Sequence, residues 1–208
     1  MVIAAVLPVL AIVSCGTAPP VANAVGTQTA QNAVSTQNAQ GSTQEISNLI
    51  GTNPPFEVRL DQFVVTPDPQ FDVTPTSISS MQVVSWNGTA QTLSVAKTPV
   101  LFVAYWCPHC QRTLTLLDKN WQTIQQKPAI VAAGYTPGTT LSQAKTLYQQ
   151  EESALHLNFP SSEVYFLLSS TENKQLVHAY PELYFTQNQK TENLIGEHVL
   201  AVWQKAFS

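Results

Sequence analysis

The chain has 208 residues, of which 44% are hydrophobic and 11% are charged, and its formal net charge at pH 7 is −4. This length and apolar content allow one domain of ordinary size with a substantial core, and they leave room for additional segments. A slightly acidic chain without a basic patch excludes nucleic acid as an expected partner.

The first 14 residues have the features of a signal peptide. Val2–Val13 is an unbroken run of apolar residues and proline, too short to span a membrane. Ile12-Val13-Ser14-Cys15 then resembles the bacterial lipobox, in which a small residue precedes the cysteine that receives diacylglycerol. We therefore expect a lipid anchor on Cys15 and a place in the bacterial cell envelope, outside the cytoplasm. An ordinary secretory signal with a free Cys15 is the alternative, because the basic residues that usually begin a signal are missing.

Two segments separate this signal from the predicted domain. Residues 15–55 are rich in Ala, Thr, Gln, Ser and Asn and predict a flexible tether, whose roughly 40 residues would reach on the order of 30 to 40 Å. Residues 56–79 are expected to form an N-terminal extension that packs on the domain. Within this extension, Phe56–Leu60 shows the alternation of a strand, and residues 66–75 are rich in proline.

The predicted domain covers residues 80–208 and begins with a hairpin. Asn87-Gly88 is a strong turn signal between two strands of Ser80–Val95. Hydrophobic periodicity then predicts these elements in chain order: a buried strand at 98–105, a helix at 111–126, a strand at 129–133, a helix at 141–155, an inserted segment at 164–177, a turn at 186–189, an edge strand at 190–195 and a closing helix at 197–207.

Cys107 and Cys110 follow the buried strand directly and are separated by two residues. One turn of helix brings such positions together, so the two sulfurs can form and break a disulfide reversibly. If the helix begins near Cys107, unpaired backbone N–H groups and the helix dipole favour its thiolate. Cys107 is then the attacking thiol, and the more buried Cys110 resolves the mixed disulfide.

The two residues between the cysteines are expected to tune this chemistry. Pro108 suits the first position of a helix, and His109 favours the thiolate of Cys107 if it is protonated or donates to the sulfur. A stabilised thiolate makes the protein a stronger oxidant, which favours disulfide donation slightly over reduction. Two other functions remain open for the pair: binding and delivery of cuprous ion, or a permanent structural disulfide in an adaptor protein. Structural zinc is disfavoured because there is no second cysteine pair.

Trp106-Cys107-Pro108-His109-Cys110 after an apolar strand resembles the active site of the thioredoxin superfamily, and its Pro-His pair resembles the DsbA-type thiol oxidases more than cytosolic thioredoxin. Ala179–Phe185 resembles the segment in which that family places a cis-proline opposite the cysteines, with Pro181 as the candidate. The resemblance implies a thioredoxin-like α/β fold: a central mixed sheet flanked by helices, a leading β-hairpin and an insertion before the cis-proline.

The resemblance also implies an activity and partners. We expect a thiol-disulfide oxidoreductase that acts on client proteins without a cofactor or a metal, is regenerated by a membrane or soluble redox partner, and is a monomer. Trp106, Tyr180 and Pro181 would contact the client. One position departs from the family: Leu101 stands where thioredoxins carry a buried acid that serves proton transfer to the resolving cysteine. We expect Glu182 or ordered water to be the substitute.

Overall fold

The apolar run before the cysteines forms the central strand β4 (Val100–Val103), and all four of its side chains are buried. The structure is a computed structural model, and it describes residues 52–168 and 175–208. β4 pairs in parallel with β5 (Ala129–Ala132) and antiparallel with β7 (Glu182–Gln187). The sheet is therefore mixed, with its parallel strands at the centre.

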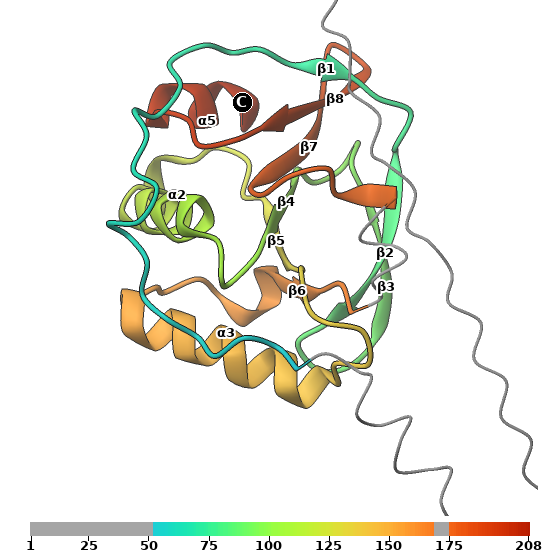
Figure 1. The fold of residues 1–208 in the computed structure, drawn as a ribbon. Helices are drawn as coiled ribbons and strands as arrows, with labels where there is room; N and C mark the ends of the chain where they lie inside the picture. Colours follow the sequence, from blue (N-terminus) through green and yellow to red (C-terminus); the bar gives the residue numbers. More distant parts are fainter. Residues whose placement is uncertain (1–51, 169–174) are drawn as a thin grey trace, which may run out of the picture. The chain divides into compact units, whose positions relative to one another are not determined.

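Eight strands form this sheet in the order β1-β8-β7-β4-β5-β6-β2-β3 (Figure 1). The remaining strands are β1 (Thr74–Pro75), β2 (Ser80–Ser85), β3 (Ala90–Ser94), β6 (Val164–Phe166) and β8 (Lys190–Ile195). β6 pairs in parallel with β5, whereas β1, β2, β3 and β8 join their neighbours antiparallel.

Within the described residues, the sheet is accompanied by the helices α2 (Pro108–Lys119), α3 (Leu141–Leu155) and α5 (Leu200–Ala206). Two short 3₁₀ turns lie at Trp121–Thr123 and Ser161–Glu163. The start of α3 is fixed by a capping box, because the Thr140 hydroxyl accepts from the Gln143 N–H while the Gln143 side chain accepts from the Thr140 N–H.

Side chains of successive β4 residues belong to two different apolar clusters, because they alternate between the faces of the sheet. Leu101 and Val103 belong to the larger cluster, which also contains both cysteines and buried apolar side chains of α2, α3 and α5. Val100 and Phe102 belong to the smaller cluster, together with buried residues of β2 and β3. The cysteines thus lie on the sheet face where these three helices pack.

The order of elements is the one that the sequence resemblance implies, and the predicted α/β fold class is confirmed. The hairpin around Asn87-Gly88, the strand at β5, the helix at α3 and the strand at β8 all form where the sequence predicts them. The signal peptide, Cys15, most of the tether and part of the inserted segment lie outside the described residues.

Three sequence predictions about elements were wrong in detail. Phe56–Leu60 forms no strand; instead, Phe56 and Leu60 pack as partly buried side chains against the larger cluster. The first helix ends at Lys119 rather than near residue 126, because the following residues tighten into a 3₁₀ turn. The strand at 190–195 is not at the edge of the sheet, because Thr74 and Pro75 of the proline-rich stretch pair with it as the edge strand β1.

No helix within residues 52–168 and 175–208 combines the length and the apolarity that crossing a bilayer requires.

Candidate functional site

Cys107 lies at the N-cap of α2, in extended backbone geometry, and Pro108 occupies the first turn. The Cys107 carbonyl accepts a helical hydrogen bond from the Gln111 N–H at 3.1 Å. Both Cys107 and Cys110 are free thiols, and they are 5% and 0% exposed. The sequence therefore places one sulfur at the helix start and the other inside the first turn, as expected from their spacing.

The surroundings of Cys107 favour its ionised form. The Cys110 thiol stabilises the thiolate, and the backbone N–H groups of Cys110 and His109 and the charge of His109 add to this effect. Burial acts in the opposite direction. The balance lowers the pKa of Cys107 to about 6, so the thiolate predominates at neutral pH.

Cys110 has the opposite character. Burial raises the pKa of its thiol well above the ordinary value, and the nearby charge of Cys107 adds to the increase. The Cys110 sulfur accepts a hydrogen bond from the Ala104 N–H at 3.3 Å. The pair therefore consists of one ionised thiol that is slightly exposed and one protonated thiol that is fully buried.

The segment at Pro181 faces the first cysteine. The Tyr180–Pro181 peptide bond is cis, and the Cys107 thiol donates to the Tyr180 carbonyl at 3.5 Å. The Pro181 carbonyl accepts from the Gly196 N–H at 2.9 Å, which ties this segment to the end of β8. The structure thus brings Cys107, Tyr180 and Pro181 together, although they are distant in sequence.

Trp106 is held between this segment and the loop after β5. Its indole N–H donates to the Gly134 carbonyl at 2.9 Å, and its ring meets Tyr180 edge-on with centroids 5.7 Å apart. Gly134 has a φ of +73°, and a Cβ there would lie 3.0 Å from the Ala104 Cβ. Glycine is needed at this position both for its backbone conformation and for the close approach.

The His109 ring bonds a carboxylate rather than the sulfur. Its Nδ1 lies 2.9 Å from Glu197 Oε2 and 2.9 Å from Arg112 Nη2. Arg112 also bonds Glu197 directly, with donor–acceptor distances of 2.8 to 3.0 Å. Burial acts to raise the pKa of Glu197, but hydrogen bonds from Arg112 and His109 outweigh it and hold that pKa below its ordinary value.

Two polar residues of α2 connect the site to the N-terminal extension. Arg112 donates to the carbonyls of Leu60, Gln62 and Phe63. Gln111 is fully buried: its amide donates to the Glu57 and Tyr105 carbonyls and accepts from the Arg59 N–H. Sequence reasoning missed Gln111, Arg112 and Glu197. Only the polar Gln111 beside Cys110 on a periodic helix offered a signal, while nothing in the sequence links Glu197 to His109.

Glu182 is fully buried, and its carboxylate is occupied by hydrogen bonds. It accepts from the His178 N–H at 2.7 Å and from the Asn193 amide at 2.8 Å, and it lies 3.0 Å from His178 Nδ1. These bonds join the segment before Pro181 to β8. The structure therefore gives Glu182 a bracing position, and it does not place the carboxylate on Cys110.

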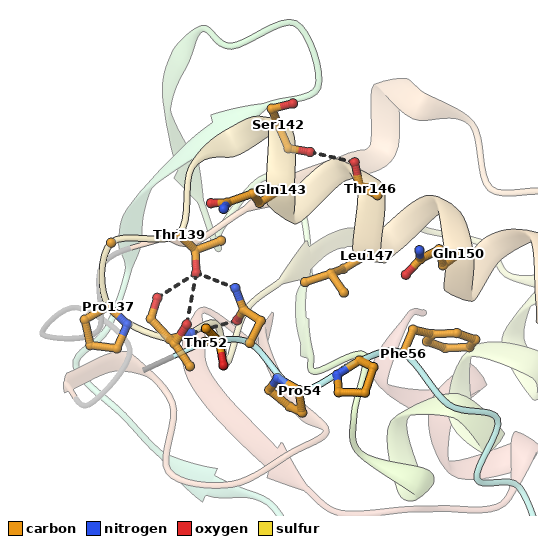
Figure 2. Close-up of a pocket in the computed structure, with 14 residues that line it drawn as sticks. Thr52, Pro54, Phe56, Pro137, Thr139, Ser142, Gln143, Thr146, Leu147 and Gln150 are labelled. Carbon is orange, nitrogen blue, oxygen red and sulfur yellow. Dashed lines mark hydrogen bonds between the residues drawn. The ribbon is translucent and has the colours of Figure 1, made fainter. Parts of the chain in front are cut away.

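A pocket of about 740 Å³ lies between residues 52–56 and α3, and neither cysteine lines it. Figure 2 shows Thr139 at one end of the pocket, with hydrogen bonds to its neighbours. One of these comes from the Asn53 amide, which donates to the Thr139 hydroxyl at 2.7 Å. Within the described part of the chain, no three His, Cys, Asp or Glu side chains gather as a metal site would require.

No family model matches the sequence, and no curated protein matches it either. Several solved structures are similar in fold. StoA from Bacillus subtilis is 13% identical, with 64% of this chain and 100% of that chain covered and a TM-score of 0.45. A secreted Mycobacterium tuberculosis disulfide oxidoreductase homologous to E. coli DsbE is 13% identical, with coverages of 61% and 91% and a TM-score of 0.40.

A secreted thiol-disulfide isomerase from Corynebacterium glutamicum is 11% identical, with coverages of 69% and 93% and a TM-score of 0.43.

The unequal thiols predict a specific pH dependence of alkylation. In the reduced protein, the rate of Cys107 alkylation by iodoacetamide should be half-maximal near pH 6, because only the thiolate reacts and its pKa is about 6. Cys110 should stay unmodified while the protein is folded, since its sulfur is buried. Peptide mapping by mass spectrometry measures both. A Cys107 midpoint near 8.5, the ordinary thiol value, would contradict this prediction.

Substitution Glu197→Gln should destabilise the protein by about 2 kcal/mol, less than for a fully buried ion pair because Arg112 stays partly exposed. The folded-state pKa of Glu197 is lowered, so its stabilisation is present above about pH 4.5 and is lost as the pH falls through the folded value. Urea unfolding at several pH values should therefore show the parent and the variant converging in acid.

The matched control is Glu57→Gln, which breaks an exposed pair with Arg59 and should change stability by less than about 0.5 kcal/mol. A constant difference between the parent and Glu197→Gln down to pH 3 would refute the assigned ionisation.

Proposed function

We propose that this chain is a thiol-disulfide oxidoreductase that acts outside the cytoplasm on cysteines of client proteins. The observation that carries the proposal is the pairing of two unequal thiols: an ionised Cys107 at the start of α2 and a protonated, fully buried Cys110 one turn further. Exchange needs this asymmetry, because the attacking sulfur must be a thiolate, whereas the resolving sulfur must stay protonated until the mixed disulfide has formed.

In the oxidising direction, a client thiolate attacks the Cys107 sulfur of the disulfide form. The bond between Cys107 and Cys110 breaks, and Cys110 leaves with the electron pair and takes up a proton. A second client thiolate then attacks the client sulfur of the mixed disulfide, and Cys107 leaves as a thiolate. The client loses two electrons and gains a disulfide, and the cysteine pair is reduced.

The low pKa of Cys107 favours this direction over client reduction. A stabilised thiolate is a good leaving group, and it stabilises the reduced form of the pair relative to the disulfide. His109 contributes its backbone N–H and its charge, while Glu197 and Arg112 hold its ring. A membrane or soluble redox partner would reoxidise the pair.

The client is proposed to bind beside Cys107, against Trp106, Tyr180 and Pro181. The Tyr180 carbonyl oxygen lies 3.5 Å from the Cys107 sulfur, so a client sulfur that reacts with Cys107 comes close to this segment. Trp106 is partly exposed and is fixed by its bond to Gly134, which suits it to contact a peptide. The anchor at Cys15 and the bacterial envelope are proposed from the signal-like N-terminus.

Single cysteine variants of the full chain test this function. With reduced ribonuclease as the client and the oxidised protein in stoichiometric amount, the parent should transfer its disulfide. Cys107→Ser should abolish transfer, because it removes the sulfur that the client attacks. Cys110→Ser should accumulate a covalent mixed disulfide between Cys107 and a client presented as a glutathione adduct, visible by mass spectrometry.

Cys15→Ser is the matched control, since that cysteine has no proposed part in exchange, and it should transfer at the parental rate. A Cys107→Ser chain that oxidises the client as fast as the parent would eliminate the proposed function.

A further inference from the structure

One face of α3 carries a carboxyl group into the protein interior. Glu151 is 1% exposed, and it stands on the same helical face as the buried Ala144, Tyr148 and Leu155. Its Oε1 is buried and makes no hydrogen bond in the described part of the chain. A buried carboxyl without a partner is costly, so its presence in an apolar helix face calls for a reason.

The groups that share this interior include both cysteines. Ala144, Tyr148 and Leu155 pack in the larger apolar cluster that contains Cys107 and Cys110. The negative charge of Glu151 raises the pKa of Cys110, after burial and the effects of Cys107. In the other direction, burial and then the charge of Cys107 raise the pKa of Glu151 to about 8.

The charge of Glu151 also acts on two buried tyrosines. Tyr135 and Tyr148 are buried, and burial followed by the charge of Glu151 raises the pKa of each well above its ordinary value. Four more titratable neighbours act on these tyrosines rather than on Glu151 itself: Tyr105 and Tyr180 on Tyr135, and Glu152 with Asp118 on Tyr148. No cation is among the groups that shift the pKa of Glu151.

Glu151 differs in this respect from the other buried acid near the site. The Glu182 carboxylate accepts hydrogen bonds from His178 and Asn193. Its neighbour Leu183 packs in the larger cluster with the cysteines, so Glu182 points to the opposite face of the sheet. The position where thioredoxins carry an acid is the fully buried Leu101. Among these three positions, only Glu151 combines an unpartnered carboxyl oxygen with an electrostatic effect on Cys110.

We propose that Glu151 is the proton acceptor for Cys110 when that thiol resolves a mixed disulfide, and its proton donor in the reverse step. The inference rests on the proposed function, and it assigns to α3 the proton transfer for which β4 offers no carboxyl.

The step balances as follows. The Cys110 thiol gives its proton to the Glu151 carboxylate, and the Cys110 thiolate attacks the Cys107 sulfur. The bond between Cys107 and the client sulfur breaks, and the client leaves as a thiolate with the electron pair. Cys107 and Cys110 are oxidised to a disulfide and the client sulfur is reduced. In reverse, Cys110 leaves as a thiolate and takes the proton from Glu151.

Coupling to Cys107 gives this transfer the correct timing. While Cys107 is a free thiolate, its charge raises the pKa of Glu151 and keeps the carboxyl protonated. When Cys107 enters a mixed disulfide, that charge is lost and Glu151 ionises more readily. The acceptor is thus made available at the stage when Cys110 must lose its proton.

The test uses 5,5′-dithiobis(2-nitrobenzoate) on the reduced full chain carrying Cys15→Ser, so that only the pair reports. Attack by Cys107 releases one thionitrobenzoate, and resolution by Cys110 releases a second; stopped-flow absorbance follows both. Glu151→Gln should leave the first phase unchanged and slow the second by about a hundredfold at pH 7, the size of a general-base contribution.

The pH profile separates proton transfer from a structural effect. In the parent, the second-phase rate should rise with pH and reach a plateau before pH 8. The pKa of Glu151 is about 8 beside the Cys107 thiolate, and it falls when that charge is lost in the mixed disulfide. In Glu151→Gln it should rise without levelling, and Glu151→Asp should recover part of the rate. Glu152→Gln, the neighbouring half-buried acid, is the matched control and should behave as the parent.

A second phase that is equal or faster in Glu151→Gln overturns the inference, because removing a charge that raises the Cys110 pKa would by itself accelerate resolution. If that variant does not fold, the pH dependence of the parent's second-phase rate is the test. A rate that rises without a plateau would overturn the inference. A parent without any second phase would instead refute exchange through the pair, and with it the proposed function.

Discussion

The placement of Cys107 at the first turn of α2 is the constraint on which the rest of the site depends. A helix leaves its first N–H groups without partners, and a sulfur held there can be stabilised as an anion without a nearby metal or a full positive charge. β4 is buried on both faces, and it delivers the chain to that point in a fixed direction. The same turn buries Cys110, so one local geometry makes the two thiols unequal.

Polar groups around the pair are arranged to hold backbone rather than to solvate the sulfurs. Gln111 and Arg112 bond carbonyls of the N-terminal extension, and Glu182 braces the segment before Pro181. The extension is therefore attached to the helix that carries the cysteines, although it contributes only a two-residue strand to the sheet. Glu151 differs from these residues because its buried Oε1 makes no hydrogen bond to any described residue.

Local patterns were sufficient to predict most of the fold and the centre of the site. The Asn87-Gly88 turn, the apolar run of β4 and the periodicity of α3 each depend on neighbours in sequence, and each forms as expected. Contacts across the chain were not predictable in this way. His109 acts on the sulfur through its backbone N–H and its charge, but its ring bonds Glu197, which no spacing rule connects to it. Which carboxyl groups act on the cysteines depends on side-chain burial, and burial depends on the packing of the complete fold.

The reduction potential of the pair as a function of pH tests the central claim most directly, because it counts the protons bound by the reduced thiols. If Cys107 ionises near pH 6 while Cys110 stays protonated, the potential measured against glutathione should fall by roughly 59 mV per pH unit below that point and by roughly 30 mV above it. A single slope of roughly 59 mV continuing to about pH 8.5 would mean two ordinary thiols and would contradict the account.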